Sequence, residues 1–230
     1  MNKNRFYNDK KFLGSMHGRP LRILSEYLGP LISLQKNKIT DTIVFFGSAR
    51  MISKSDYYKK ARDLAYKLTK WNMKSFKDEH RFVITTGGGP GIMEAANKGA
   101  KEAGGKSVGF GISLPFEPTS NTWITKGLNF VFHYFFMRKF WFIYKTKGIV
   151  VCPGGFGTLD ELFDVLTLLQ TKKITRKIPI VLFGTQYWDG LIDWDRMISN
   201  NVISSSDLKL FVILDSVDET FDYLTNNMQK

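Results

Sequence analysis

Two residue types that often build reactive or metal-binding sites are scarce in this chain. Its 230 residues include one cysteine, Cys152, and three histidines, which are isolated from one another. A single cysteine cannot form a disulfide within the chain, and the histidines show no metal-ligand spacing. The sequence therefore predicts no internal disulfide and no metal centre, as expected in a reducing cytoplasm. Cys152 ends an apolar run without an evident activating neighbour, which indicates a buried filler rather than a nucleophile.

A long uninterrupted apolar run is also absent. The most hydrophobic region, residues 128–144, is broken by His133, Arg138 and Lys139, which argues against a transmembrane helix. The N-terminal residues are polar and basic, without the apolar segment of a secretory signal. We therefore expect a cytoplasmic protein that has no membrane partner.

The sequence does not match either of two common nucleotide-binding motifs. The spacing G-x-G-x-x-G is broken at both of its candidate positions, where Ile92 and Asp160 replace the third glycine. The triplet Gly105-Lys106-Ser107 resembles the end of a Walker A loop, but Ala100 stands where its first glycine is required. That triplet also leads into an expected strand rather than a helix. These departures argue against a dinucleotide-dependent dehydrogenase and a P-loop NTPase.

The excess of positive charge raises the question of nucleic acid. The net charge is +12, from 33 basic and 21 acidic residues. Outside the first 40 residues, the basic residues are spread thinly, as pairs such as Lys59-Lys60, Lys172-Lys173 and Arg176-Lys177. None of these pairs has the interleaved aromatic residues of a nucleic-acid recognition motif. A solvated basic surface is therefore favoured, and it would still attract an anionic substrate.

Apolar runs alternate with stretches of helical periodicity along most of the chain. The expected strands are 42–46, 81–85, 107–114, 128–133, 148–152, 178–183 and 211–214. The expected helices are 20–36 (with a possible break at Gly29-Pro30), 55–71, 90–103, 135–144, 158–171, 187–200 and 217–227. This alternation predicts one doubly wound, Rossmann-like α/β domain over residues 20–230, with a mostly parallel sheet and helices on both faces. Residues 1–19 are basic and lack periodicity, and we expect a flexible arm there.

Glycine-bearing loops follow the expected strands. They are Gly47-Ser48, Gly87-Gly88-Gly89 and Pro153-Gly154-Gly155. Ligands of such folds bind beyond the carboxyl ends of the strands, and glycine lets the backbone approach a ligand closely. The three loops therefore predict a binding site on one rim of the sheet.

The role of Glu161 has two interpretations. Thr158 is a suitable N-cap residue and Glu161 follows three positions later, which is the spacing of a capping box. A carboxylate at the start of a helix, next to a glycine loop, is also suited to catalysis. Spacing alone favours the capping box.

The stretch Pro153-Gly154-Gly155-Phe156-Gly157-Thr158-Leu159-Asp160-Glu161 resembles the PGGxGTxxE signature of the Lonely Guy family of nucleoside 5′-monophosphate phosphoribohydrolases. Three further blocks are similar to that family and occur in its order: residues 46–50, residues 86–96 and Met137-Arg138-Lys139. The longer bacterial branch is the best match. The resemblance implies hydrolysis of a purine nucleoside 5′-monophosphate, either AMP or a cytokinin riboside monophosphate, to the free base and ribose 5-phosphate, without a cofactor. It also implies a homodimer or a larger assembly.

The resemblance assigns catalysis to Arg138 and Glu161. A carboxylate stabilises the positive charge that develops on the sugar, whereas an arginine cannot readily give up a proton and would hydrogen-bond the substrate. Further substrate contacts are expected from Gly47, Ser48, Gly88, Gly89, Glu94, Glu117, Met137, Lys139, Gly154, Gly155, Phe156, Gly157, Thr158 and Thr167.

Several features bear on specificity and on alternative functions. Ala49-Arg50 and Phe136 differ from the plant members of the family, which favours AMP over a cytokinin substrate. A nucleotide-binding protein that does not hydrolyse its ligand is the alternative, and Arg138 with Glu161 argues for the enzyme. Proteins of this kind often carry the label lysine decarboxylase, but no lysine here has a convincing Schiff-base context.

Overall fold

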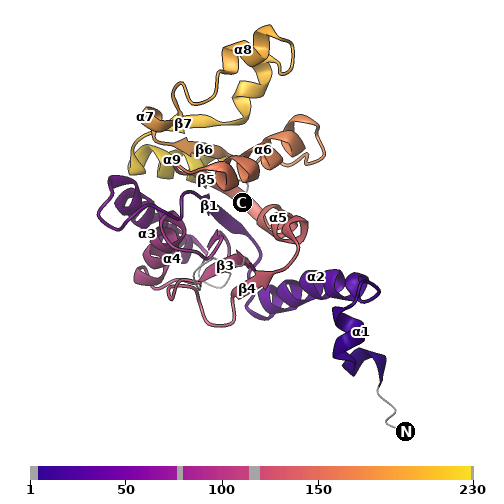
Figure 1. Cartoon of the computed structure of the whole chain (residues 1–230). Coiled ribbons are helices and arrows are strands. Elements are labelled where there is room, and N and C mark those ends of the chain that lie inside the picture. The colour runs from indigo at the N-terminus through magenta and orange to yellow at the C-terminus, as the bar shows by residue number, and fades with distance from the viewer. Residues whose placement is uncertain (1–4, 77–79, 114–119, 229–230) are drawn as a thin grey trace.

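A single parallel sheet forms the centre of the molecule (Figure 1). The computed structural model describes residues 5–76, 80–113 and 120–228. Its seven strands lie in the order β4-β3-β2-β1-β5-β6-β7, and all neighbours pair in parallel. The strands are β1 Thr42–Phe46, β2 Val83–Thr86, β3 Ser107–Ile112, β4 Asn129–Phe132, β5 Thr146–Val151, β6 Ile180–Phe183 and β7 Val212–Leu214. The predicted doubly wound α/β fold is therefore confirmed.

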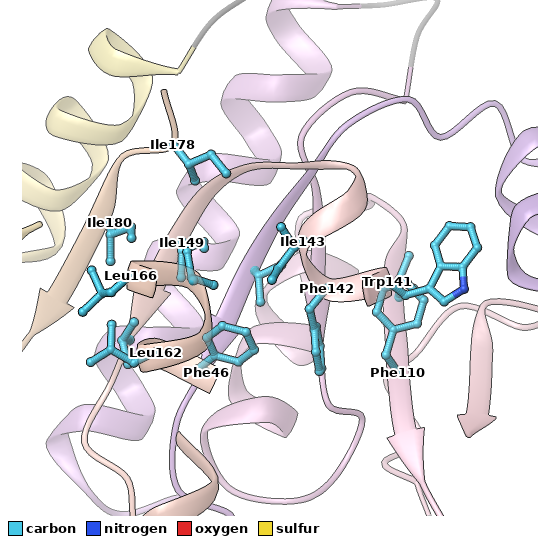
Figure 2. Close-up of a cluster of buried hydrophobic side chains, with 14 of the residues drawn as sticks. Phe46, Phe110, Trp141, Phe142, Ile143, Ile149, Leu162, Leu166, Ile178 and Ile180 are labelled. Carbon is cyan, nitrogen blue, oxygen red and sulfur yellow. The ribbon is translucent and has the colours of Figure 1, made fainter. Parts of the chain in front are cut away.

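Helices cover the two faces of the sheet and enclose two apolar cores. One core contains side chains from α3 (Asp56–Ser75), α4 (Ile92–Glu102) and α9 (Val217–Asn227). The other contains side chains from α2 (Arg19–Lys36), α5 (Phe135–Tyr144), α6 (Phe156–Gln170) and α7 (Thr185–Trp188). Figure 2 shows part of the second core, where aromatic residues of α5 face Phe46 and Phe110 on the strands. Every residue of β1 is buried, as expected for a parallel strand that is covered on both faces.

The chain departs from the predicted helices at several places. α2 continues through Pro30 without a break between residues 19 and 36. The prediction of one helix over residues 187–200 is wrong, because α7 ends at Trp188 and α8 (Trp194–Ser199) begins separately. Gly190 has a φ of +72°, and the Asp193 side chain caps α8 by accepting from the Arg196 N–H. A 3-10 helix, η2 (Ser205–Leu210), was not predicted.

The N-terminal segment contains two short helices, η1 (Phe6–Asn8) and α1 (Lys10–Gly14). Asp9 caps α1, and the Arg22 guanidinium on α2 donates to the carbonyl oxygens of Leu13 and Ser15. α1 projects beyond the end of α2, away from the sheet (Figure 1). The domain boundary at residue 19 stays a prediction. No helix among the described residues has the length and apolar character needed to cross a membrane.

Candidate active site

The three predicted glycine loops meet at the carboxyl ends of the central strands. β1 and β5 are neighbours, and the chain builds the sheet outward from them in opposite directions, so this is the position where open parallel sheets bind ligands. The Ser48 N–H donates to the Pro153 carbonyl at 2.9 Å, which joins the loops after β1 and β5. The Ile92 N–H donates to the Ser48 carbonyl at 3.1 Å and attaches the second glycine loop.

The N-terminus of α6 lies in this cluster and has no side-chain cap. The helix begins at Phe156 with Gly155 as its N-cap, so the prediction that Thr158 caps it is wrong. The first backbone bond of the helix is from the Leu159 N–H to the Gly155 carbonyl, at 3.1 Å. The N–H groups of Phe156, Gly157 and Thr158 have no acceptor within the described ranges. Free N–H groups at the positive end of a helix favour an anion such as phosphate.

The surroundings of this helix end leave space for a ligand. A Cβ atom on Gly155 or Gly157 would have no other atom within 4 Å, and Phe156 is 93% exposed. Gly154 is packed closely instead, since a side chain there would collide with Thr158. Gly91 has a φ of +69° and lies against Ser48 and Ala49, so glycine is needed there for both conformation and space.

A buried ion pair connects α5 to α6. Nη1 of Arg138 lies 2.9 Å from Oε1 of Glu161, and the two side chains are 13% and 12% exposed. The Arg138 Nε–H donates to the Phe110 carbonyl at 2.8 Å, and its guanidinium lies 4.9 Å from the centre of the Phe142 ring. The Glu161 carboxylate therefore faces Arg138 and does not reach back to the helix end as a capping box requires.

The environment of Glu161 favours the protonated, uncharged form of its carboxyl group. Burial raises the pKa of the Glu161 carboxyl to about 7, and the charges of Arg138 and Lys139 only partly oppose this rise. A carboxyl with a pKa near neutral can accept and release protons at physiological pH. Perturbed carboxyl groups of this kind are frequent in active sites.

The neighbours of Arg138 on α5 have different surroundings. Met137 is buried in the core beneath the helix. Lys139 forms an ion pair of 2.7 Å with Asp160, which lies next to Glu161. Lys139 on α5 therefore contacts α6, the helix that carries Glu161, but it pairs with the carboxylate of Asp160.

A polar network holds the second glycine loop. Thr86 Oγ1 accepts from the Gly88 N–H at 2.9 Å, so this N–H is already used within the protein. Asn121 Nδ2 donates to the carbonyl oxygens of Gly88 and Gly89 at 3.0 and 2.9 Å, and also to Asn97 Oδ1. Asn97 and Asn121 were not predicted, because neither residue belongs to a glycine block or a charged motif.

Glu94, in the first turn of α4, is held by a residue that was also missed. The Tyr58 hydroxyl donates to Glu94 Oε1 at 2.9 Å. Burial is the largest cause that raises the pKa of Tyr58, and this hydrogen bond is the next. The hydroxyl therefore remains protonated and acts as a donor. The sequence around Tyr58 gives no sign of this contact.

Two of the predicted site residues are not found in this cluster. Glu117 falls outside the described residues. Thr167 donates to the Phe163 carbonyl at 2.7 Å and lines a separate cavity of about 150 Å³ between α6, α8 and η2.

Cys152 is completely buried, and burial raises the pKa of its thiol to about 12, which disfavours a nucleophilic thiolate. Among the described residues there is no group of three or more His, Cys, Asp or Glu side chains that could hold a metal.

Comparisons with known proteins place the chain among relatives with a shared name. A family model described as "Possible lysine decarboxylase" matches residues 93–224. The cytokinin riboside 5′-monophosphate phosphoribohydrolase LOG3 of Arabidopsis thaliana is 26% identical over 182 residues, which are 78% of this chain and 79% of LOG3. An enzyme of the same name from Mycobacterium tuberculosis (strain ATCC 25618 / H37Rv) is 32% identical over 77 residues, or 33% of this chain and 40% of that protein.

Solved structures with a similar fold include cofactor-binding proteins. The molybdenum cofactor binding protein of Rippkaea orientalis has a TM-score of 0.54 and 19% identity, covering 82% of this chain and 95% of its own. The molybdenum cofactor carrier protein of Chlamydomonas reinhardtii has a TM-score of 0.52 and 22% identity, covering 81% and 97%. At these identities the likeness establishes the shared fold only.

Proposed function

The chain belongs to the Lonely Guy (LOG) family, and from this membership we propose that it hydrolyses the N-glycosidic bond of a purine nucleoside 5′-monophosphate. The products are the free base and ribose 5-phosphate. The observation that carries the proposal is the buried Arg138–Glu161 pair beside the uncapped N-terminus of α6. This arrangement combines an anion-binding position with a carboxylate between one and two helical turns away.

The phosphate of the substrate occupies the N-terminus of α6. There the N–H groups of Phe156, Gly157 and Thr158 supply donors, and the open space at Gly155 and Gly157 admits the ligand. A nucleoside without a 5′-phosphate loses these interactions. The phosphate therefore fixes the ribose in front of Glu161.

Glu161 acts on the ribose. As the bond between base and sugar breaks, positive charge builds on the ribose, and the ionised carboxylate stabilises that charge. With a pKa of about 7, Glu161 is also suited to take a proton from the attacking water. The water oxygen bonds to the sugar carbon as the bond to the base breaks; the leaving base takes up a proton from solvent, and Glu161 releases to solvent the proton that it took from the water.

Arg138 orients the carboxylate and contacts the substrate. Its Nε–H is fixed on the Phe110 carbonyl and Nη1 on Glu161, so the guanidinium has a defined direction in the site. Arginine keeps its charge at all relevant pH values, which suits a hydrogen-bonding and electrostatic role. AMP is the substrate that we favour, since Ala49-Arg50 and Phe136 replace residues typical of the plant enzymes.

Decarboxylation of lysine has less support than hydrolysis. A pyridoxal phosphate decarboxylase requires a lysine that forms a Schiff base with the cofactor. The lysine next to Arg138, Lys139, is ion-paired with Asp160. The family description therefore names a chemistry that these side chains do not favour.

We also propose a homodimer that forms through α2 and α5. These helices border an apolar groove of about 590 Å³ on the surface. Leu24 is 50% exposed and Phe136 is also 50% exposed, although both are large apolar side chains. Exposed apolar surfaces of this kind are typical of protein interfaces, and a second copy of the chain related by two-fold symmetry would cover both helices.

The decisive experiment is a chromatographic assay of free base from AMP and from adenosine. We expect adenine from AMP and almost none from adenosine, because only AMP engages the α6 N-terminus. Equal turnover of the two compounds would contradict the role of the phosphate. Saturable binding of AMP without release of adenine would support the non-catalytic alternative instead.

A further inference from the structure

A second groove lies at the opposite rim of the sheet from the candidate active site. Its volume is about 510 Å³, and it is formed by the end of α6, the segment before β6, the end of η2 and one side of α9. The end of α6 and the segment before β6 precede β6 in the chain, and η2 precedes β7, so the groove is at the amino-terminal ends of those strands. It is therefore separate from the glycine loops, which follow the carboxyl ends.

Four cations line this groove. They are Lys172, Arg176, Lys177 and Lys209, and the described lining contains no Asp or Glu. Lys172 and the pair Arg176-Lys177 belong to the basic pairs that are scattered along the sequence, and the fold gathers them with Lys209 from a distant segment.

The charges of these side chains are not neutralised by close ion pairs. In the part of the chain that the structure describes, Lys172, Lys177 and Lys209 form no salt bridge. Arg176 donates to the carbonyl oxygens of Ile143 and Tyr144, and its interaction with Asp41 acts only at longer range. Like charges that face one groove repel one another, and an anion between them would relieve that repulsion.

The backbone at Lys172 provides an independent observation. Lys172 follows Thr171, the C-cap residue of α6, and has a φ of +55°. Glycine is the usual residue at this left-handed position after a helix, because a side chain there is conformationally unfavourable. A lysine in this unfavourable conformation indicates a function for its side chain, which lines the groove.

We propose that this groove binds a small molecule that carries two or more phosphate groups. Its volume falls within the range of small-molecule sites, roughly 300–1,000 Å³. The lysines supply point charges for phosphate oxygens, and Ile174 and Tyr223 provide an apolar wall for an organic part of the ligand. A nucleic-acid strand fits less well, because Tyr223 is the only aromatic residue among the described lining, and strand binding uses successive aromatic platforms.

The test is a calorimetric titration of the full-length protein with inorganic tripolyphosphate at low ionic strength. Ribose 5-phosphate is added in excess, so that the proposed active site is occupied. The variant Lys177→Ala/Lys209→Ala is compared with Lys36→Ala/Lys126→Ala, which removes the same charge from exposed lysines elsewhere. We expect at least about tenfold weaker binding in the first variant and unchanged binding in the control.

Lys172→Gly separates ligand binding from a structural role. Glycine suits the left-handed backbone, so the melting temperature should not fall, whereas tripolyphosphate should bind more weakly. Equal binding by the two double variants would overturn the proposal. Tighter binding of a single-stranded oligonucleotide than of tripolyphosphate, lost in the same variant, would overturn it in favour of a nucleic-acid surface. Base release from AMP should be unchanged in Lys177→Ala/Lys209→Ala, so this test does not depend on the proposed function.

Discussion

Gly87 leaves the space that the guanidinium of Arg138 occupies. A Cβ atom on Gly87 would lie 2.7 Å from Arg138 Nη2 and 2.7 Å from the Met93 sulfur, closer than non-bonded heavy atoms normally approach. Gly87→Ala should therefore push the guanidinium away from Glu161. We expect base release from AMP to fall by about tenfold to a hundredfold, since small displacements of catalytic groups have effects of this size.

The matched control for this change is Gly29→Ala. Gly29 is on the surface of α2, and a Cβ atom there meets nothing within 4 Å. This variant should keep full activity and gain a little helix stability. Circular dichroism should show that both variants are folded; an active Gly87→Ala enzyme would show that Arg138 has room to adjust.

Glu161→Gln tests the negative charge of the proposed catalytic carboxylate. Glutamine is nearly the same size and can still accept a hydrogen bond from Arg138, but it cannot stabilise a cationic sugar. We expect base release to drop by at least about a hundredfold, while AMP still binds. Single-turnover kinetics and equilibrium binding distinguish these two effects.

Asp164→Asn makes the same chemical change one turn further along α6 and serves as the control. Asp164 has no ion pair among the described residues, and its replacement should leave turnover unchanged. Near-normal turnover by Glu161→Gln would remove Glu161 from the reaction.

The pH dependence of hydrolysis should report the shifted pKa of Glu161. Because burial raises this pKa from 4.5 to about 7, the carboxyl is protonated at pH values where an ordinary glutamate is ionised. If the ionised form is required, kcat/KM should fall about tenfold per pH unit below about pH 7 and level off above it. A decline that begins only near pH 4.5 would contradict this environment for Glu161.

The same shift has a consequence for stability. The folded state holds the Glu161 proton more tightly than the unfolded state does, so ionisation opposes folding. This contribution is absent below about pH 4.5, grows as the pH rises, and is complete above about pH 7. Glu161→Gln should remove it, and denaturant unfolding at several pH values would measure the change.

Leu24→Asp tests the proposed dimer. A charged side chain in the apolar groove between α2 and α5 would lose its hydration in a two-fold interface, among mostly apolar residues. We expect this variant to sediment as a monomer at concentrations where the wild type is a dimer. Val202→Asp changes an apolar residue on another surface that is even more exposed than Leu24 and should not alter the assembly; a wild-type monomer would refute the proposal.

Strands and long helices were predictable because their apolar periodicity is continuous. Residues 42–46, 135–144 and 217–227 have the same bounds in the sequence prediction and in the structure. The start of α6 was misplaced because Thr158 is a better N-cap by residue type than Gly155. Propensity cannot show that the helix extends into the glycine loop and leaves its end open for an anion.

The contacts of the candidate site were only partly predictable. The family motifs singled out Arg138 and Glu161, but their 2.9 Å ion pair depends on the packing of α5 against α6. Tyr58 and Asn121 lack a local signal, because each acts on a residue that is distant in the sequence. The basic groove was unpredictable for the same reason, because Lys209 joins residues 172–177 only when η2 packs near α6 in the fold.

The strand order has a consequence for the order in which the protein can assemble. β1, β2, β3 and β4 are contiguous along the chain and adjacent in the sheet, whereas β1 meets β5 only after residues 47–145 have been made. Until then, β1 is an apolar edge strand, and such edges are prone to aggregate. Pairing over this sequence separation is also expected to be slow. Because the glycine loops meet at the junction of β1 and β5, a newly synthesised chain acquires its candidate active site and covers the open edge of β1 in the same step.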